Sequence, residues 1–235
     1  MQKLLLVFLL LRFFMKMKQT KVYMTMDASG AYKAAINGHI VVIVDIIDMS
    51  TSLETALEMG AAAVFGASPD QIYAPVIVNP EKIAMGAAFV AQKLNTEVII
   101  IGEPRFASKE EQMENCQRLV NKLTEMNTKI CDFVPNVGKE LWAFAHIGKK
   151  IAIAVTSTGG VAFDAAYNAG GIVTTATIAR TRHMRGKAPA LKGAYRAKNL
   201  ALELKRDISY VAASSKSYED VLAAKYLCDL TKGLS

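Results

Sequence analysis

The chain has few cysteines, few aromatic side chains and no motif that marks a known class of binding protein. Its three cysteines, Cys116, Cys131 and Cys228, are far apart and odd in number. Because this spacing forms neither a disulfide framework nor a metal-binding pattern, it favours a reducing, cytoplasmic location. Aromatic residues make up 8% of the 235 residues and are little interleaved with the basic ones. The net charge of +7 therefore does not indicate nucleic-acid binding.

An apolar run at the N-terminus is too short to span a bilayer. Leu4 to Leu11 follows Lys3, as the apolar part of a signal peptide would, but the basic stretch 15–21 stands where a cleavage site is needed. We interpret residues 1–26 as an apolar and basic extension outside the functional domain, without stable membrane insertion. A membrane anchor is the alternative interpretation.

Residues 27–235 alternate between apolar runs and helical patterns. Hydrophobic residues make up 52% of the chain and charged residues 21%, which is typical of a folded α/β protein. The alternation predicts a mainly parallel sheet with helices on both faces. Two similar strand–loop–helix units suggest two related halves, about 27–140 and 141–235. The apolar content is also compatible with a homo-oligomer.

The second of these units is rich in hydroxyls and glycines. Ile151 to Val155 is an apolar run that predicts a buried strand. A loop follows at the start of a short helix, and its residues are Thr156, Ser157, Thr158, Gly159 and Gly160. A helix N-terminus offers N–H groups and a positive dipole, so this loop is a candidate phosphate-binding site. An ordinary turn, in which Thr and Ser only cap the helix, is the alternative.

The first unit is acidic. His39 to Asp45 predicts a second buried strand that ends in a carboxylate, and the following loop carries Asp48, Ser50 and Thr51. In open α/β sheets, ligands bind outside the carboxyl ends of the strands. If both strands belong to one sheet, Asp45 and its neighbours face the loop 156–160 across a crevice.

Three further segments carry polar residues near predicted strand ends. Arg180 and Arg182 belong to a basic loop that either grips phosphate oxygens or is simply solvated. Glu103 and Arg105 either pair at the surface or contribute to a site. Ser217 predicts a helix cap together with Asp220, while the adjacent carboxylates Glu219 and Asp220 also suit a magnesium site. Tyr73 to Val78 predicts a strand, followed by Asn79 as a cap and Pro80 as the first helical residue.

Three segments, residues 42–61, 148–160 and 217–225, resemble the 2-phosphosulfolactate phosphatase family. They include Asp-Ile-Ile-Asp-Met-Ser-Thr from Asp45, Thr-Ser-Thr-Gly-Gly from Thr156 and Ser-Tyr-Glu-Asp from Ser217. The resemblance implies that family's α/β fold and a magnesium-dependent phosphatase. Its substrate would be a small anionic phosphorylated hydroxy or sulfo acid, such as 2-phosphosulfolactate.

The resemblance also assigns roles to residues. Asp45 and Asp48 would be catalytic, and Asp45, Glu219 and Asp220 would hold Mg²⁺. The loop 156–160 would hold the phosphate, and Arg180 or Arg182 an anionic tail. Asp48 stands where the family has an arginine, and the family's middle signature has only faint counterparts at 102–105 and 135–136.

Two alternatives to a phosphatase follow from the residues. The replacement at Asp48 and the missing middle signature favour a protein that kept the pocket but lost the reaction, and that binds a small anion or acts as a scaffold. A nucleotide-binding protein is the third candidate, although the loop 156–160 is neither a G-x-G-x-x-G motif nor a P-loop.

Overall fold

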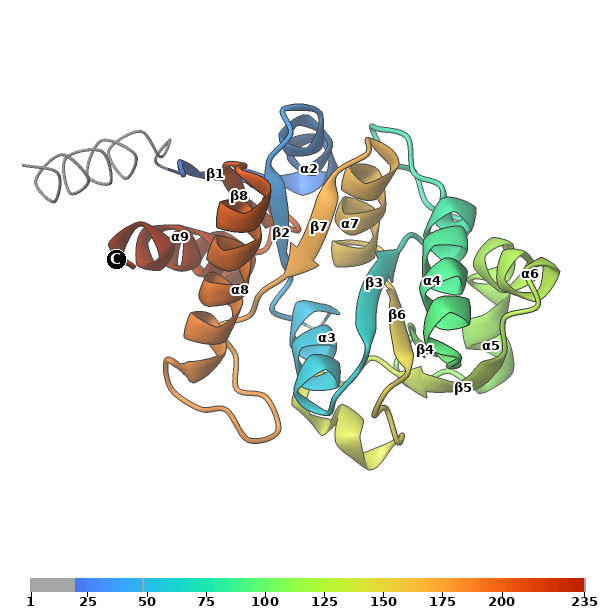
Figure 1. The fold of residues 1–235 in the computed structure, drawn as a ribbon. Helices are drawn as coiled ribbons and strands as arrows, with labels where there is room; N and C mark the ends of the chain where they lie inside the picture. Colours follow the sequence, from blue (N-terminus) through green and yellow to red (C-terminus); the bar gives the residue numbers. More distant parts are fainter. Residues whose placement is uncertain (1–19, 48, 235) are drawn as a thin grey trace, which may run out of the picture.

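The computed structural model describes residues 20–47 and 49–234 (Figure 1). Most of the predicted N-terminal extension and Asp48 therefore lie outside the described residues. Residues Val22–Met26, at the end of that predicted extension, form strand β1 and pair with β8 (Ile208–Ala212). The folded domain thus begins before residue 27. Between residues 20 and 234, leaving aside 48, no helix has both the length and the apolar character needed to cross a membrane.

In the described part of the chain, eight parallel strands form two sheets of four. The first sheet has the order β1-β8-β2-β7, with β2 at Ile40–Val44 and β7 at Ile172–Thr175. The second has the order β3-β6-β4-β5, and its strands are Ala63–Ala67, Ile151–Val155, Val98–Gly102 and Ile130–Pro135. The predicted parallel α/β architecture is confirmed, but the strands divide into two sheets where one was expected.

Helices connect the strands and cover the sheets. They are α2 (Asp27–Ile36), α3 (Met49–Glu58), α4 (Pro80–Leu94), α5 (Lys109–Glu114), α6 (Gln117–Glu125), η1 (Gly138–Ala143), α7 (Gly159–Asn168), α8 (Ala188–Leu204) and α9 (Tyr218–Gly233). Asn79 caps α4 by accepting a hydrogen bond from the Lys82 N–H, and Pro80 is its first residue, as predicted.

The chain passes from one sheet to the other through α3 and α7. Helix α3 leads from β2 in the first sheet to β3 in the second, and α7 returns from β6 to β7. Each of these helices contacts strands of both sheets, so the two sheets share one apolar core around them (Figure 1). Both sheets also mix strands from the two predicted halves. The similarity of those halves stays a prediction.

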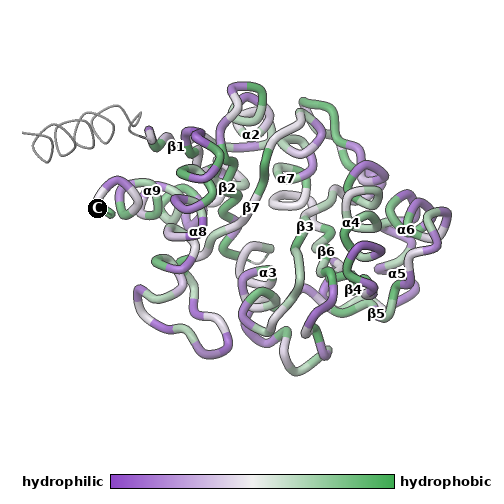
Figure 2. Tube along the Cα trace, viewed as in Figure 1, coloured by the Kyte–Doolittle hydropathy of each residue, from purple (hydrophilic) through white to green (hydrophobic). Residues whose placement is uncertain are grey.

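The burial of each strand matches its place in the sheet. The central strands β2, β8, β4 and β6 are buried at every residue, whereas the edge strands are only partly buried. Parallel strands covered on both faces require continuous apolar sequences. This requirement explains runs such as Ile-Val-Val-Ile-Val in β2, and Figure 2 shows hydrophobic residues gathered along strands such as β2 and β7.

A buried ion pair joins α3 to α8 and β7. The Glu54 carboxylate, 2% exposed, pairs with the Arg196 guanidinium and accepts a 2.7 Å hydrogen bond from the Thr175 hydroxyl. Arg196 also donates to the Thr174 hydroxyl at 3.1 Å and to the Thr175 carbonyl at 2.8 Å. Burial raises the pKa of Glu54, while the positive charge of Arg196 opposes that rise.

We predict that Arg196→Met lowers the free energy of unfolding by about 3 kcal/mol at neutral pH, because Glu54 is left buried without a counter-ion. The deficit should shrink in acid, where Glu54 is protonated, and in the double variant with Glu54→Gln. Lys225→Met, which removes an exposed pair with Asp229, should change stability by less than about 1 kcal/mol. Chemical denaturation measures the free energy of unfolding of all three variants. Equal losses for Arg196→Met and Lys225→Met would contradict the prediction.

Candidate functional site

Asp45 lies at the end of β2, where the N-termini of α3 and α7 meet. Its Oδ2 accepts hydrogen bonds from the Gly159 N–H at 2.8 Å and from the Thr158 hydroxyl at 2.9 Å. The Met49 N–H, at the start of α3, also stabilises the carboxylate. Helix N-termini carry partial positive charge, so the Asp45 carboxylate is placed where an anion is favoured. The predicted meeting of Asp45 with the loop 156–160, called the glycine loop below, occurs, although the strands that precede them belong to different sheets.

Burial dominates the electrostatics of Asp45. The residue is 2% exposed, and its burial raises the pKa of the carboxyl above the usual value. The hydrogen bonds from Thr158 and Gly159 lower this pKa, and the negative charge of Glu103 raises it further. Asp45 therefore holds its proton more tightly than an exposed aspartate does.

Asp220 lies beside Asp45 and is bound to the same turn. Its Oδ1 accepts a 2.8 Å hydrogen bond from the N–H of Ile46, the residue after Asp45. Burial raises the pKa of Asp220 to about 6, and the charge of Asp45 adds to the rise. Ser217 caps α9 by accepting from the Asp220 N–H at 3.4 Å, as the capping interpretation predicts. Glu219 is exposed.

The glycine loop packs tightly against the protein. The Gly159 N–H donates to Asp45, and the Gly160 N–H donates to the Thr156 hydroxyl at 2.7 Å. A Cβ on Gly159 would lie 2.4 Å from Asp45 Oδ2, and one on Gly160 would lie 2.1 Å from the Ala67 carbonyl oxygen. Close packing thus accounts for both glycines. Two of the N–H groups expected to hold phosphate are already engaged within the protein.

A cavity of about 370 Å³ opens beside this loop. Thr156 and Ser157 line it from the end of β6, and Glu103 and Arg105 line it from the end of β4. The remaining lining residues are Pro69, Gln71, Ile72, Pro104, Asn115 and Val155. Its volume lies in the range of small-molecule sites, which begins at about 300 Å³. Two hydroxyl residues and an arginine therefore line one cavity, whose lining does not include Asp45 or Asp220.

A buried hydrogen-bond chain supports Glu103, which the sequence marked only as a weak candidate. Glu103 Oε1 accepts from Asn136 Nδ2 at 2.9 Å, and Asn136 Oδ1 accepts from the Ser52 hydroxyl at 2.6 Å. The Ser52 oxygen in turn accepts from the Gly138 N–H at 2.8 Å. Asn136 is fully buried. The segments 102–105 and 135–136 therefore meet, and their positions after neighbouring parallel strands were the signal for it.

The hydroxyls of Ser50 and Thr51 donate to the turn before α3, and neither residue lines the cavity. The Ser50 hydroxyl donates to the Asp45 carbonyl at 2.6 Å. The Thr51 hydroxyl donates to the Ile46 carbonyl at 2.9 Å and lies 3.0 Å from the Thr177 hydroxyl. These contacts fix the turn that carries Asp45.

The basic loop docks on α3 and η1. Glu58 accepts hydrogen bonds from the N–H groups of His183, at 3.2 Å, and Met184, at 3.1 Å. The Arg182 guanidinium lies 4.9 Å from the centre of the Trp142 ring. Arg180 and Arg182 are both exposed, and neither lines the cavity described above.

The predicted metal ligands are placed only in part. Asp45 and Asp220 adjoin the same turn, Glu219 is exposed, and Asp48 lies outside the described residues. In the described part of the chain, no group of three or more His, Cys, Asp or Glu side chains is arranged to hold a metal ion.

No protein-family model matches this chain, and no curated protein does either. The likeness to the 2-phosphosulfolactate phosphatases therefore rests on the three sequence segments alone and stays a prediction.

We predict that Gly159→Ala destabilises the protein by about 2 kcal/mol, because the new methyl group displaces the Asp45 carboxylate. Gly233→Ala is the matched control, since a Cβ there meets nothing within 4 Å. Thermal and chemical unfolding of both variants measure the difference. An unchanged stability for Gly159→Ala would contradict the close contact.

The raised pKa of Asp220 predicts a pH-dependent stability. Between its ordinary value of 3.8 and about 6, the unfolded chain loses this proton first, so folding stability falls as the pH rises. The stability of Asp220→Asn relative to the unchanged protein should therefore increase by up to about 3 kcal/mol between pH 4 and 7 in the presence of chelator. Denaturation at several pH values measures it, and a constant difference would contradict the assignment.

Proposed function

We propose that this protein is a magnesium-dependent phosphatase for a small phosphorylated hydroxy or sulfo acid. The observation that carries the proposal is the cavity between the ends of β4 and β6. Ser157, which is exposed, brings a hydroxyl to its lining, and Arg105 brings positive charge. Arginine and hydroxyl groups are suited to phosphate, carboxylate or sulfonate oxygens. The cavity volume of about 370 Å³ limits the ligand to a small acid.

The paired carboxylates fit a magnesium ion in their chemistry. Asp45 and Asp220 are buried side by side, and the charge of Asp45 raises the pKa of Asp220. A divalent cation would relieve this repulsion. Magnesium commonly uses only one or two carboxylates, with water and substrate phosphate completing its shell. Asp45 and Asp220 would hold it, and when bound it would polarise the phosphoryl group.

The other residues position the substrate and the carboxylates. Thr158 and Gly159 hold Asp45 in one orientation through Oδ2. The Asn136 amide holds Glu103 at the cavity wall. Glu103 also places negative charge near Asp45, which raises the demand for a cation at this point.

An anion-binding protein without catalysis is the second candidate, and two observations favour it. Asp45 is 2% exposed, and the N–H groups of Gly159 and Gly160 already donate within the protein. In this case the cavity binds a phosphorylated or sulfonated acid but no turnover follows. The buried carboxylate then serves only to join α3 to α7.

We predict that the purified protein releases phosphate from one or more acids in a panel that includes 2-phosphosulfolactate, with Mg²⁺ present. Chelator should abolish this turnover. Asp45→Asn and Asp220→Asn should each reduce kcat/KM by about 100-fold or more, because both remove a magnesium ligand. Asp229→Asn, on the exposed face of α9, is the matched control and should retain full activity.

Two outcomes would contradict the phosphatase proposal. A well-folded protein that releases no phosphate from any acid in the panel would favour the binding protein, and calorimetry with the same acids would then measure the affinity. Turnover that resists chelator would contradict the role of magnesium.

A further inference from the structure

A strap of eight residues, 71–78, lies beside the cavity without any backbone hydrogen bonds. Tyr73 to Val78 was predicted to be a strand, and the segment does alternate in burial as a strand does. Yet within residues 20–47 and 49–234 no N–H or carbonyl of the strap has a hydrogen-bond partner, so that prediction is wrong. An extended segment without a neighbouring strand depends on its side chains and its two ends.

One face of the strap packs on helices and the other faces solvent. Ile72, Ala74, Val76 and Val78 pack on a small apolar cluster formed by residues of α2 and α7. The opposite face exposes Tyr73, at 94%, and Ile77, at 75%. The side chains on the packed face are only partly buried, so this face buries little apolar surface.

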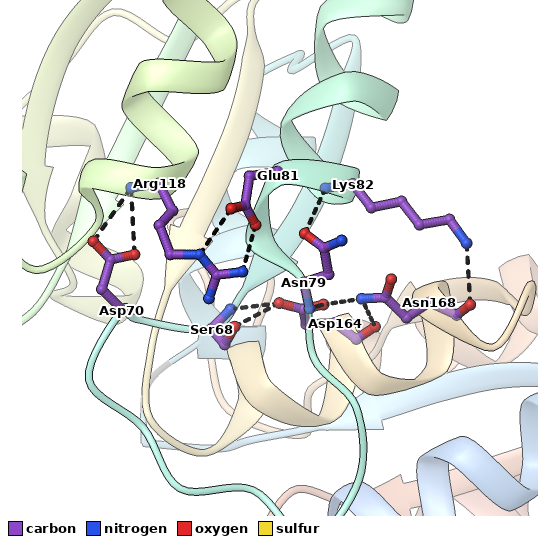
Figure 3. A network of polar contacts seen from close by, with 8 residues as sticks. All are labelled: Ser68, Asp70, Asn79, Glu81, Lys82, Arg118, Asp164 and Asn168. Atoms are coloured by element: carbon purple, nitrogen blue, oxygen red, sulfur yellow. Dashed lines mark hydrogen bonds and ion pairs between the residues drawn. The ribbon is translucent and has the colours of Figure 1, made fainter.

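One buried carboxylate holds both ends of the strap (Figure 3). Asp164, in α7, is fully buried. Its Oδ2 accepts from the Ser68 hydroxyl at 2.6 Å and from the Ser68 N–H at 3.2 Å, before the strap. Its Oδ1 accepts from the Asn79 N–H at 2.8 Å, after the strap, and from Asn168 Nδ2 at 2.5 Å.

A second contact secures the first end from outside. Asp70 accepts from the Arg118 N–H at 3.2 Å, and its own N–H donates to the Asn115 carbonyl at 2.9 Å. Arg118 is in turn paired with Glu81 at 2.7 Å (Figure 3). At the Asn79 end, the backbone N–H donates to Asp164, while the carbonyl and side chain of Asn79 accept hydrogen bonds from the start of α4. That end is therefore held both by the buried carboxylate and by α4.

The strap forms part of the proposed substrate cavity. Gln71 and Ile72 line it together with Thr156 and Ser157 of the glycine loop and with Glu103, which follows β4. Asp164 lies in the same helix whose first N–H, that of Gly159, donates to Asp45. Helix α7 thus supports the Asp45 carboxylate at its N-terminus and the strap from its middle.

We propose that Asp164 is a positioning residue that holds the strap as a wall of the cavity and so sets the size of the acid that enters. This inference rests on the proposed function for the identity of the ligand. The attachment of the strap to Asp164 does not depend on the proposed function. The cost of burying a carboxylate is offset here by four hydrogen bonds, three to the two ends of the strap and one from Asn168 in the same helix.

Chymotrypsin tests the holding of the strap directly, because the chain has two matched cleavage sites. Tyr73 in the strap is 94% exposed and Phe106 in the neighbouring loop is 96% exposed, and alanine follows each of them. Proteolysis requires a segment to open locally, so the rate at each site reports its local stability. Cleavage is mapped by mass spectrometry on the full chain under native conditions.

Asp164→Ala removes all four accepted hydrogen bonds and should speed cleavage after Tyr73 by about tenfold or more. Asp164→Asn keeps the size and one acceptor oxygen, and should speed it by a smaller factor of about threefold. Cleavage after Phe106 should stay within about twofold in both variants. If Asp164→Ala does not fold, the ratio of the cleavage rates after Tyr73 and Phe106 in Asp164→Asn provides the same test.

Two results would overturn the proposal. Equal acceleration at both sites would show that Asp164 stabilises the whole domain and not the strap. An unchanged rate after Tyr73 in folded variants would show that the strap does not depend on Asp164.

The effect on the cavity is tested separately by kinetics. In Asp164→Asn, KM for the accepted acid should rise about tenfold with kcat within about twofold, because the wall binds substrate and takes no part in the reaction. An unchanged KM, or a fall in kcat alone, would overturn the role in the cavity. If no variant turns over any acid, the proposed function fails, while the cleavage ratio still tests the strap.

Discussion

The fold depends on one buried carboxylate at the point where two helices begin. Asp45 ends a central strand of the first sheet and receives N–H groups from the starts of both α3 and α7. These two helices carry the chain from one sheet to the other and back. A single carboxylate therefore fixes the junction between the sheets, and its negative charge compensates the positive ends of two helix dipoles. The candidate site lies at this junction because three strand ends converge there, from β2, β4 and β6.

The same junction concentrates negative charge in a dry environment. Asp45 and Asp220 are nearly completely buried, and Glu103 lies close enough to influence Asp45. Burial raises the pKa values of both aspartates, and the negative charge of Glu103 adds to the rise for Asp45 as that of Asp45 does for Asp220. Such an arrangement costs stability unless a cation or protons neutralise it. This charge lies close to a cavity that Ser157 and Arg105 line, and it is on these two features that the proposal of a magnesium-assisted reaction on a phosphorylated acid rests.

The sequence allows the strands and the meeting of Asp45 with the glycine loop to be predicted, because continuous apolar runs and strand-end polar residues are local signals. The division into two sheets could not be predicted, since nothing local indicates which strand pairs with which. The role of Asp164 was also missed. It lies in a helix that reads as apolar, and its partners Ser68 and Asn79 are distant in sequence. The strap reads as a strand because its alternation is real, but the pattern does not reveal that a neighbouring strand is absent.

The most direct test of the metal-binding claim is a crystal structure of the protein grown with Mn²⁺ and inorganic phosphate, with anomalous diffraction data collected at the manganese edge. Manganese prefers the same oxygen ligands as magnesium and identifies its own position by its anomalous signal. The account predicts a peak within bonding distance of the Asp45 and Asp220 carboxylates, with phosphate in the cavity lined by Thr156 and Ser157. A manganese peak elsewhere, with both carboxylates bound only to protein groups, would contradict it.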